Sequence, residues 1–172
     1  MSNPESYTIL ALGGIPQNLD LAAVSPLSDN PLYAVLGTIQ DEFLGSWNGA
    51  DETLEPPDDG VLRIALGGLD NGNENATLKD VLSTLRELGI SYDVDDSGSF
   101  EWNPSAAWWR PGMVEPLRYQ CDHDGVATLP RNAVESALAE FPEALDAIRK
   151  LFPSPPPLKD APAAEIGVVI TT

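Results

Sequence analysis

The sequence predicts an α+β fold, with a mixed or antiparallel sheet built from two duplicated β–loop–α units and two hairpins, and with helices packed on one face. The first observation is a weak internal repeat between residues 6–45 and 60–90. Within it, ALGGI at 11–15 returns as ALGGL at 65–69. The second observation is a change from helical to strand-like hydrophobic spacing after Gly89. The third is an apolar content of 42%, which is typical of a globular domain.

Each repeat unit is expected to contain one helix. In the first unit, Asn30 is placed to cap a helix that begins at Pro31, because proline suits the first helical position. In the second unit, Thr77 is expected to cap the helix and Gly89 to end it. The apolar stripes at helical spacing are Leu32, Val35, Leu36, Ile39 and Phe43 in the first helix, and Leu78, Val81, Leu82, Leu85 and Leu88 in the second.

Two hairpins and a last helix are expected after Gly89. The expected strands are 90–94 paired with 99–102, and 117–121 paired with 126–129, with turns at 95–98 and 122–125. A helix over 132–152, kinked or restarted at Pro142, completes a single domain over residues 1–152. Residues 153–172 are expected to form a proline-rich spacer and an apolar, strand-like tail.

The charge of the chain favours a partner over a reaction. It carries 27 acidic and 9 basic residues, a formal net charge of −18, and its first basic residue is Arg63. Mutual repulsion of carboxylates opposes the folded state, so a basic partner, bound cations or a saline cell must compensate. Nucleic acid and anionic membranes would be repelled. The single cysteine, and the lack of a signal peptide or membrane-length apolar run, predict a cytoplasmic, microbial protein.

An acidic loop is the first candidate contact surface. It places five carboxylates within nine residues around two prolines, namely Asp51, Glu52, Glu55, Asp58 and Asp59. Such an array can steer a basic partner and can stand in for the phosphates of DNA. In composition, though in no motif, the chain is similar to restriction inhibitors, other DNA mimics and acidic immunity proteins.

An aromatic segment is the second candidate. Trp102, Trp108 and Trp109 lie close together and are followed by Arg110. Tryptophan and arginine dominate the binding energy of many interfaces, and Arg110 could stack on Trp108 or Trp109. The alternative is ordinary core packing, although on a strand Trp108 and Trp109 point to opposite faces.

Other chemistry receives little support from the sequence. Asp93, Asp95 and Ser97 match the first ligand positions of a calcium loop, but a proline occupies its twelfth position, so they are a weak candidate and no metal is predicted. Cys121 and His123 resemble a nucleophile and base only in residue type, and a structural cysteine is favoured. No phosphate-binding motif is present, and no cofactor is predicted.

The predicted function is that of a small acidic, non-enzymatic inhibitor that blocks a basic partner, such as a nuclease or another DNA-binding protein. Two alternatives stay open. One is a salt-adapted enzyme or small-ligand binder with an aromatic-lined pocket. The other is a structural or assembly protein that adds its C-terminal tail to a neighbour's sheet.

Overall fold

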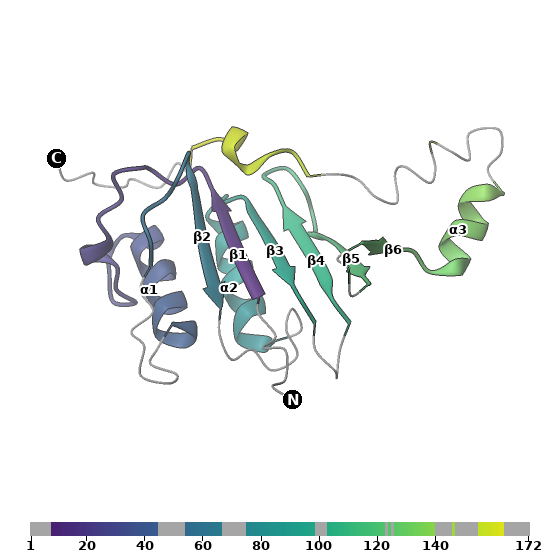
Figure 1. Cartoon of the computed structure of the whole chain (residues 1–172). Coiled ribbons are helices and arrows are strands. Elements are labelled where there is room, and N and C mark those ends of the chain that lie inside the picture. The colour runs from purple at the N-terminus through teal and green to yellow at the C-terminus, as the bar shows by residue number, and fades with distance from the viewer. Residues whose placement is uncertain are drawn as a thin grey trace, which may run out of the picture.

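The fold is built on one antiparallel sheet, in which the described strands lie in the order β2-β1-β3-β4-β5-β6 (Figure 1). The strands are β1 (Thr8–Gly13), β2 (Val61–Leu66), β3 (Tyr92–Asp96), β4 (Ser105–Trp109), β5 (Leu117–Cys121) and β6 (Ala127–Thr128). The helices are α1 (Pro31–Phe43), α2 (Ala76–Glu87) and α3 (Arg131–Leu138), with 3-10 turns η1 (Leu21–Ala23) and η3 (Leu158–Asp160). They belong to a computed structural model that describes residues 8–44, 54–66, 75–98, 103–122, 124, 126–139, 146 and 155–163.

Helices α1 and α2 lie on one face of the sheet (Figure 1), and the core lies between them and the strands. Alternate strand residues point into this core, and Leu10 and Leu12 of β1 are both 0% exposed. The predicted apolar stripes supply the other side, since every member is buried except Leu88, which is partly buried. The α+β class is confirmed, and all pairings among the described strands are antiparallel. The common origin of the two repeat units stays a prediction.

The first helix begins where the sequence predicts. The side chain of Asn30 accepts a hydrogen bond from the backbone N–H of Leu32 at 3.0 Å, and Pro31 is the first helical residue. Gly37 lies where α1 crosses the preceding loop. A Cβ atom at this position would lie 2.2 Å from the backbone of Ser25 and Pro26, so only glycine permits this approach.

The second helix begins earlier than predicted. Asn75, rather than Thr77, is the N-cap, and its side chain accepts the backbone N–H of Leu78 at 3.1 Å. Both residue types cap well, and capping by Asn75 adds Ala76, the best helix former, to the first turn. The end was predicted correctly, because Gly89 follows the helix with a φ of +71°.

One hairpin is confirmed and the other is displaced. Strand β5 has the predicted bounds, and it pairs with β6 inside the predicted 126–129. The predicted pairing of 90–94 with 99–102 is wrong, because β3 pairs with β4 in a register that joins Asp96 to Ser105. Asp96 still belongs to the strand, and its carboxylate accepts the N–H of Gly98, so the turn starts later than expected. Residues 99–102 lie outside the described residues.

The C-terminal segment 155–163, which we call the strap, lies against β1 on the sheet face opposite α1 and α2. Its Leu158 is 8% exposed. A Cβ atom at Gly13 would lie 2.9 Å from both the carbonyl oxygen of Leu158 and the Cβ of Ala161, so the strap can approach only because residue 13 is glycine. The predicted spacer therefore contains a 3-10 turn that packs on the sheet, whereas the expected tail lies outside the described residues.

The last predicted helix is seen in part. Helix α3 ends at Leu138, and of the remainder of the expected 132–152 the structure describes only Ala139 and Asp146. Most described side chains of α3 are exposed. No helix among the described residues is long and apolar enough to span a membrane.

Candidate functional site

The candidate site lies on the sheet face that α1 and α2 leave uncovered, which we call the outer face. The strand register places one row of side chains across it, in the order Arg63, Ala11, Asp93, Trp108 and Leu117. A neighbouring row contains Ala65, Ile9, Asp95, Ala106 and Tyr119. Because side chains alternate along a strand, residues two apart stay on the same face. In the first row the short side chain of Ala11 on β1 therefore lies between the charged side chains of Arg63 and Asp93.

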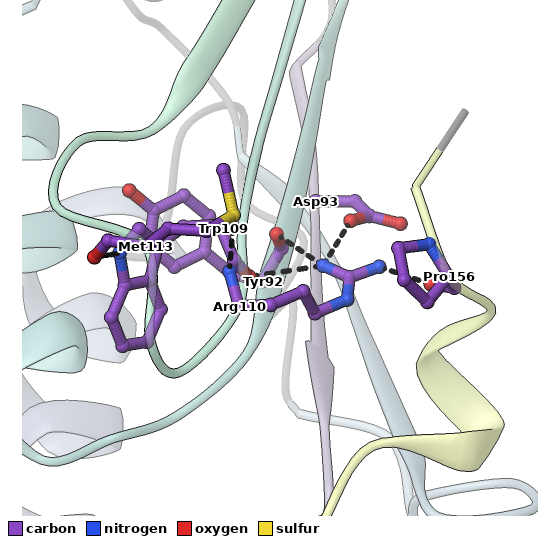
Figure 2. Close-up of polar contacts among 6 residues, drawn as sticks. All are labelled: Tyr92, Asp93, Trp109, Arg110, Met113 and Pro156. Carbon is purple, nitrogen blue, oxygen red and sulfur yellow. Dashed lines mark hydrogen bonds and ion pairs between the residues drawn. The ribbon is translucent and has the colours of Figure 1, made fainter. Parts of the chain in front are cut away.

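Arg110 joins three parts of this face (Figure 2). Its Nη1 donates to the Asp93 carboxylate at 2.7 Å, and to the backbone carbonyls of Tyr92 and Trp109, each at 3.0 Å. Its Nη2 donates to the carbonyl of Pro156 in the strap at 2.6 Å. The guanidinium carbon also lies 5.5 Å from the centre of the Trp108 ring, which is a cation–π distance. Arg110 is only 9% exposed. Its hydrogen bonds therefore connect β3, β4 and the strap below the protein surface.

A tight turn after β4 fixes the position of Arg110. The backbone N–H of Met113 donates to the carbonyl of Arg110 at 3.1 Å, and Gly112 supplies a φ of +97°. The indole N–H of Trp109 donates to the carbonyl of Met113 at 3.0 Å (Figure 2). The ring of Trp109 stacks on Tyr92, with a centroid distance of 6.3 Å, on the core side of the sheet.

Trp108 and Trp109 therefore point to opposite faces, as the sequence predicts. Both are buried, with 8% and 6% of their surfaces exposed. Trp109 contributes to the hydrophobic core, whereas Trp108 lies on the outer face under Arg110. The indole nitrogen of Trp108 is buried and has no hydrogen-bond partner among the described residues.

A groove of about 590 Å³ lies beside this arrangement, along β1 and under the strap. Its lining is Ile9, Ala11, Asp58, Asp59, Val61, Arg63, Asp93, Asp95, Pro157, Leu158 and Lys159. Four of these residues are acidic and two are basic, so the groove is negative overall. Ile9 and Ala11 form an apolar floor because they point away from the core.

The two carboxylates of β3 differ in their surroundings. Asp93 is ion-paired with Arg110, and their side chains are 28% and 11% exposed. Asp95 lies two residues further along the same face. Partial loss of water and repulsion by the Asp93 carboxylate raise the pKa of Asp95. A cationic group that entered the groove would relieve this repulsion.

The acidic loop is described in part, and that part lies at the groove. Asp58 and Asp59 line it, in a turn closed by hydrogen bonds between the backbones of Asp58 and Val61 at 2.9 Å. Asp59 has a φ of +50°, a conformation that aspartate and asparagine tolerate better than most residues. Glu55, which precedes Asp58 by three residues, is exposed. Asp51 and Glu52, like Trp102, lie outside the described residues.

The arrangement of the described residues supports neither the metal site nor the nucleophile that the sequence suggested as candidates. Among the described residues, no group of three acidic, histidine or cysteine side chains is placed to hold a metal ion. Burial and the charges of Asp95 and Asp122 raise the pKa of the Cys121 thiol, which disfavours the reactive thiolate. His123 lies outside the described residues.

Sequence reasoning selected three parts of this site separately but missed their convergence. Asp58 and Asp59, Asp93 and Asp95, and Trp108 with Arg110 all meet on the outer face. It also missed Arg63 and the strap. The alternation of acidic and apolar residues along 92–96 was the available signal, since it marks a strand with one carboxylate-bearing face.

Comparison of the chain with protein-family models, with curated proteins and with solved structures finds no match.

Proposed function

We propose that this protein is a non-enzymatic binding protein that takes a basic segment of a partner protein into the groove of its outer face and thereby blocks that partner. The observation that carries the proposal is the convergence of four carboxylates, Asp58, Asp59, Asp93 and Asp95, from two distant parts of the chain around an apolar floor. Lysine and arginine side chains match such a groove, because their stems are apolar and their ends are cationic.

The net charge of −18 supports the proposal beyond the groove itself. A field of this sign accelerates the approach of a basic protein and disfavours acidic competitors. A nuclease or another DNA-binding protein is the sharpest choice of partner, because its nucleic-acid site already selects for dense negative charge. In that case duplex DNA and this protein compete for the same surface.

Arg110 and Trp108 support the groove rather than form its surface. Both are buried, and Arg110 holds the Asp93 carboxylate and the strap in place. We propose that the preformed position of Asp93 reduces the entropy lost on binding, since its side chain is already ordered. The exposed carboxylates Asp58, Asp59 and Asp95 then add the remaining acidic contacts with the partner.

A charge-matched pair of variants tests the proposal. D58N/D59N/D95N removes three carboxylates from the groove, whereas D29N/D41N/E87Q removes three exposed carboxylates from α1, α2 and the residue before the α1 cap. Binding of a short oligoarginine peptide is measured by calorimetry over a range of salt concentrations. The groove variant should weaken binding about tenfold, because three exposed pairs at about 0.5 kcal/mol each sum to about 1.5 kcal/mol, and it should flatten the salt dependence.

The control variant should bind within about twofold of the wild type, because its charges lie away from the groove. Equal losses in both variants would show that only net charge matters, and would refute the groove. The nucleic-acid version is tested separately with a basic nuclease: duplex DNA should displace the protein from it. Binding that DNA leaves unchanged would contradict mimicry while leaving the basic partner in place.

A further inference from the structure

A second pocket, on the helix side of the sheet, has the opposite charge. It has a volume of about 420 Å³ and is lined by Lys79, Leu82, Arg86, Glu115, Pro116 and Arg118. Among the described residues, three of the chain's nine basic residues and one carboxylate line it. We call it the basic pocket. In a protein with three acids for every base, a site with this charge calls for an explanation.

The basic pocket is formed where α2 lies beside the sheet. Lys79, Leu82 and Arg86 are spaced at i, i+3 and i+7, which places them on one side of the helix. Arg118 pairs with Ala107 in the strand register, and Ala107 pairs with the core residue Val94, so Arg118 lies on the helix-facing side of β5. The pocket therefore combines one helix and one strand that are separate in sequence.

A rigid part of the core orients one of the cations. Nη1 of Arg86 donates to the hydroxyl of Tyr92 at 3.2 Å, and Tyr92 is 0% exposed and stacks on Trp109. Burial raises the pKa of Tyr92, while the charges of Arg86 and Arg118 lower it and that of Glu115 raises it. Three of the four charged residues that line the basic pocket thus act on the same hydroxyl.

We propose that the basic pocket binds a small molecule through a doubly charged oxyanion, such as a phosphoryl group. Two guanidinium groups and an ammonium group are the usual partners of such an anion, and arginine can hold two of its oxygens at once. The volume is that of a small-molecule site, so a ligand larger than the anion itself can be accommodated over Leu82 and Pro116.

The overall negative charge of the protein makes such a site selective. Beyond a Debye length of about 8–10 Å, salt screens the distant carboxylates, so an anion at the pocket responds mainly to the cations that line it. The other charged residues of the chain are mostly acidic and repel anions. Since this site lies on the sheet face opposite to the outer groove, it is independent of the proposed partner binding.

The test uses inorganic phosphate as the probe, and sodium chloride at the same ionic strength as the reference. Calorimetry should give one saturable phosphate site, and the Tm should rise along the same saturation curve, which the general stabilisation by excluded phosphate would not follow. Malonate provides a second arm: saturable stabilisation by malonate alone would support an oxyanion site and identify carboxylates as its ligands. If neither anion exceeds chloride, the proposal is wrong.

Two double variants locate the site. K79Q/R118Q removes two cations from the basic pocket, and R63Q/K159Q removes two cations from the outer groove, so the net charges are equal. All four residues are exposed, and Arg86 is kept because it bonds to the core. K79Q/R118Q should weaken phosphate binding about a hundredfold, or tenfold for each charge-assisted contact. R63Q/K159Q should retain binding within about twofold.

A third variant gives a change in the other direction. E115Q removes the carboxylate of the basic pocket and should tighten phosphate binding severalfold, which loss of structure would not do. Equal weakening in both double variants, or unchanged binding in E115Q, would overturn the assignment of the anion to this pocket.

Discussion

Replacement of Arg110 by methionine tests whether this residue holds the outer face together. The change keeps the length of the side chain but removes its bonds to four oxygens, those of Asp93, Tyr92, Trp109 and Pro156. Removing one partner of a buried ion pair typically costs about 3–5 kcal/mol. Here the Asp93 side chain is 28% exposed and regains some water, so we expect a loss of about 2–3 kcal/mol in the free energy of unfolding.

The measurement is urea unfolding, supported by thermal unfolding. For a chain of 172 residues, this loss corresponds to a decrease in Tm of about 5–10 °C. R131M is the matched control, because Arg131 forms an ion pair with Glu135 whose side chains are 91% and 59% exposed. An exposed pair of this kind contributes at most about 0.5 kcal/mol. Similar, small effects of R110M and R131M would refute the role of Arg110.

A double-mutant cycle with D93N separates the ion pair from the other contacts of Arg110. If the pair is real, the double variant R110M/D93N loses less stability than the sum of the single variants, with a coupling of about 1–2 kcal/mol. Additivity within about 0.5 kcal/mol would show that the two side chains act independently.

Two further predictions concern the strap and the pH dependence of stability. G13A should displace the strap and cost about 1–2 kcal/mol, because the new Cβ meets Ala161 and Leu158 and the burial of Leu158 is lost. In G13A, hydrogen exchange should become faster in residues 155–163, and unchanged exchange would contradict the packing of the strap on β1. Adding A161G to G13A should restore only part of the lost stability, because the Leu158 carbonyl still obstructs the new Cβ. D95N should raise the Tm at pH 7, because the folded state raises the pKa of Asp95 and so binds its proton more tightly than the unfolded state does. Ionised Asp95 lowers the free energy of unfolding fully above its folded pKa, and this cost disappears as the pH falls toward the unfolded pKa of about 4. The stability advantage of D95N over the wild type should therefore shrink in acid. An advantage that stays constant when unfolding is measured across this pH range would contradict the raised pKa.

The elements that were predicted closely carry strong local signals. Asn30-Pro31 defines the start of α1 almost alone, and the turn-forming residues at 122–125 define the second hairpin. The start of α2 was missed because Asn75 and Thr77 are both good caps, and local sequence does not choose between them. Strand β4 was misplaced because aromatic residues before Ser105 have equal strand character.

The candidate site depends on register, which local patterns do not contain. Ala11 separates Arg63 from Asp93 only because β1 lies between β2 and β3. The contact of Arg110 with Pro156 joins residues 46 positions apart. The basic pocket likewise requires α2 to lie beside β5, so the three cations lining it appear scattered in the sequence. Such pairings follow from the packing of the whole chain rather than from any segment of it.

The strand order has a consequence for synthesis of the chain. β1 is made before the other described strands but lies in the interior of the sheet, and its neighbours β2 and β3 follow only at residues 61 and 92. Until they emerge from the ribosome, both hydrogen-bonding edges of β1 are open to other chains. The first sixty-two residues contain ten carboxylates and no lysine, arginine or histidine, so nascent chains repel one another throughout that interval. We therefore expect the acidic N-terminal third of the chain to disfavour aggregation through β1 while the sheet is incomplete.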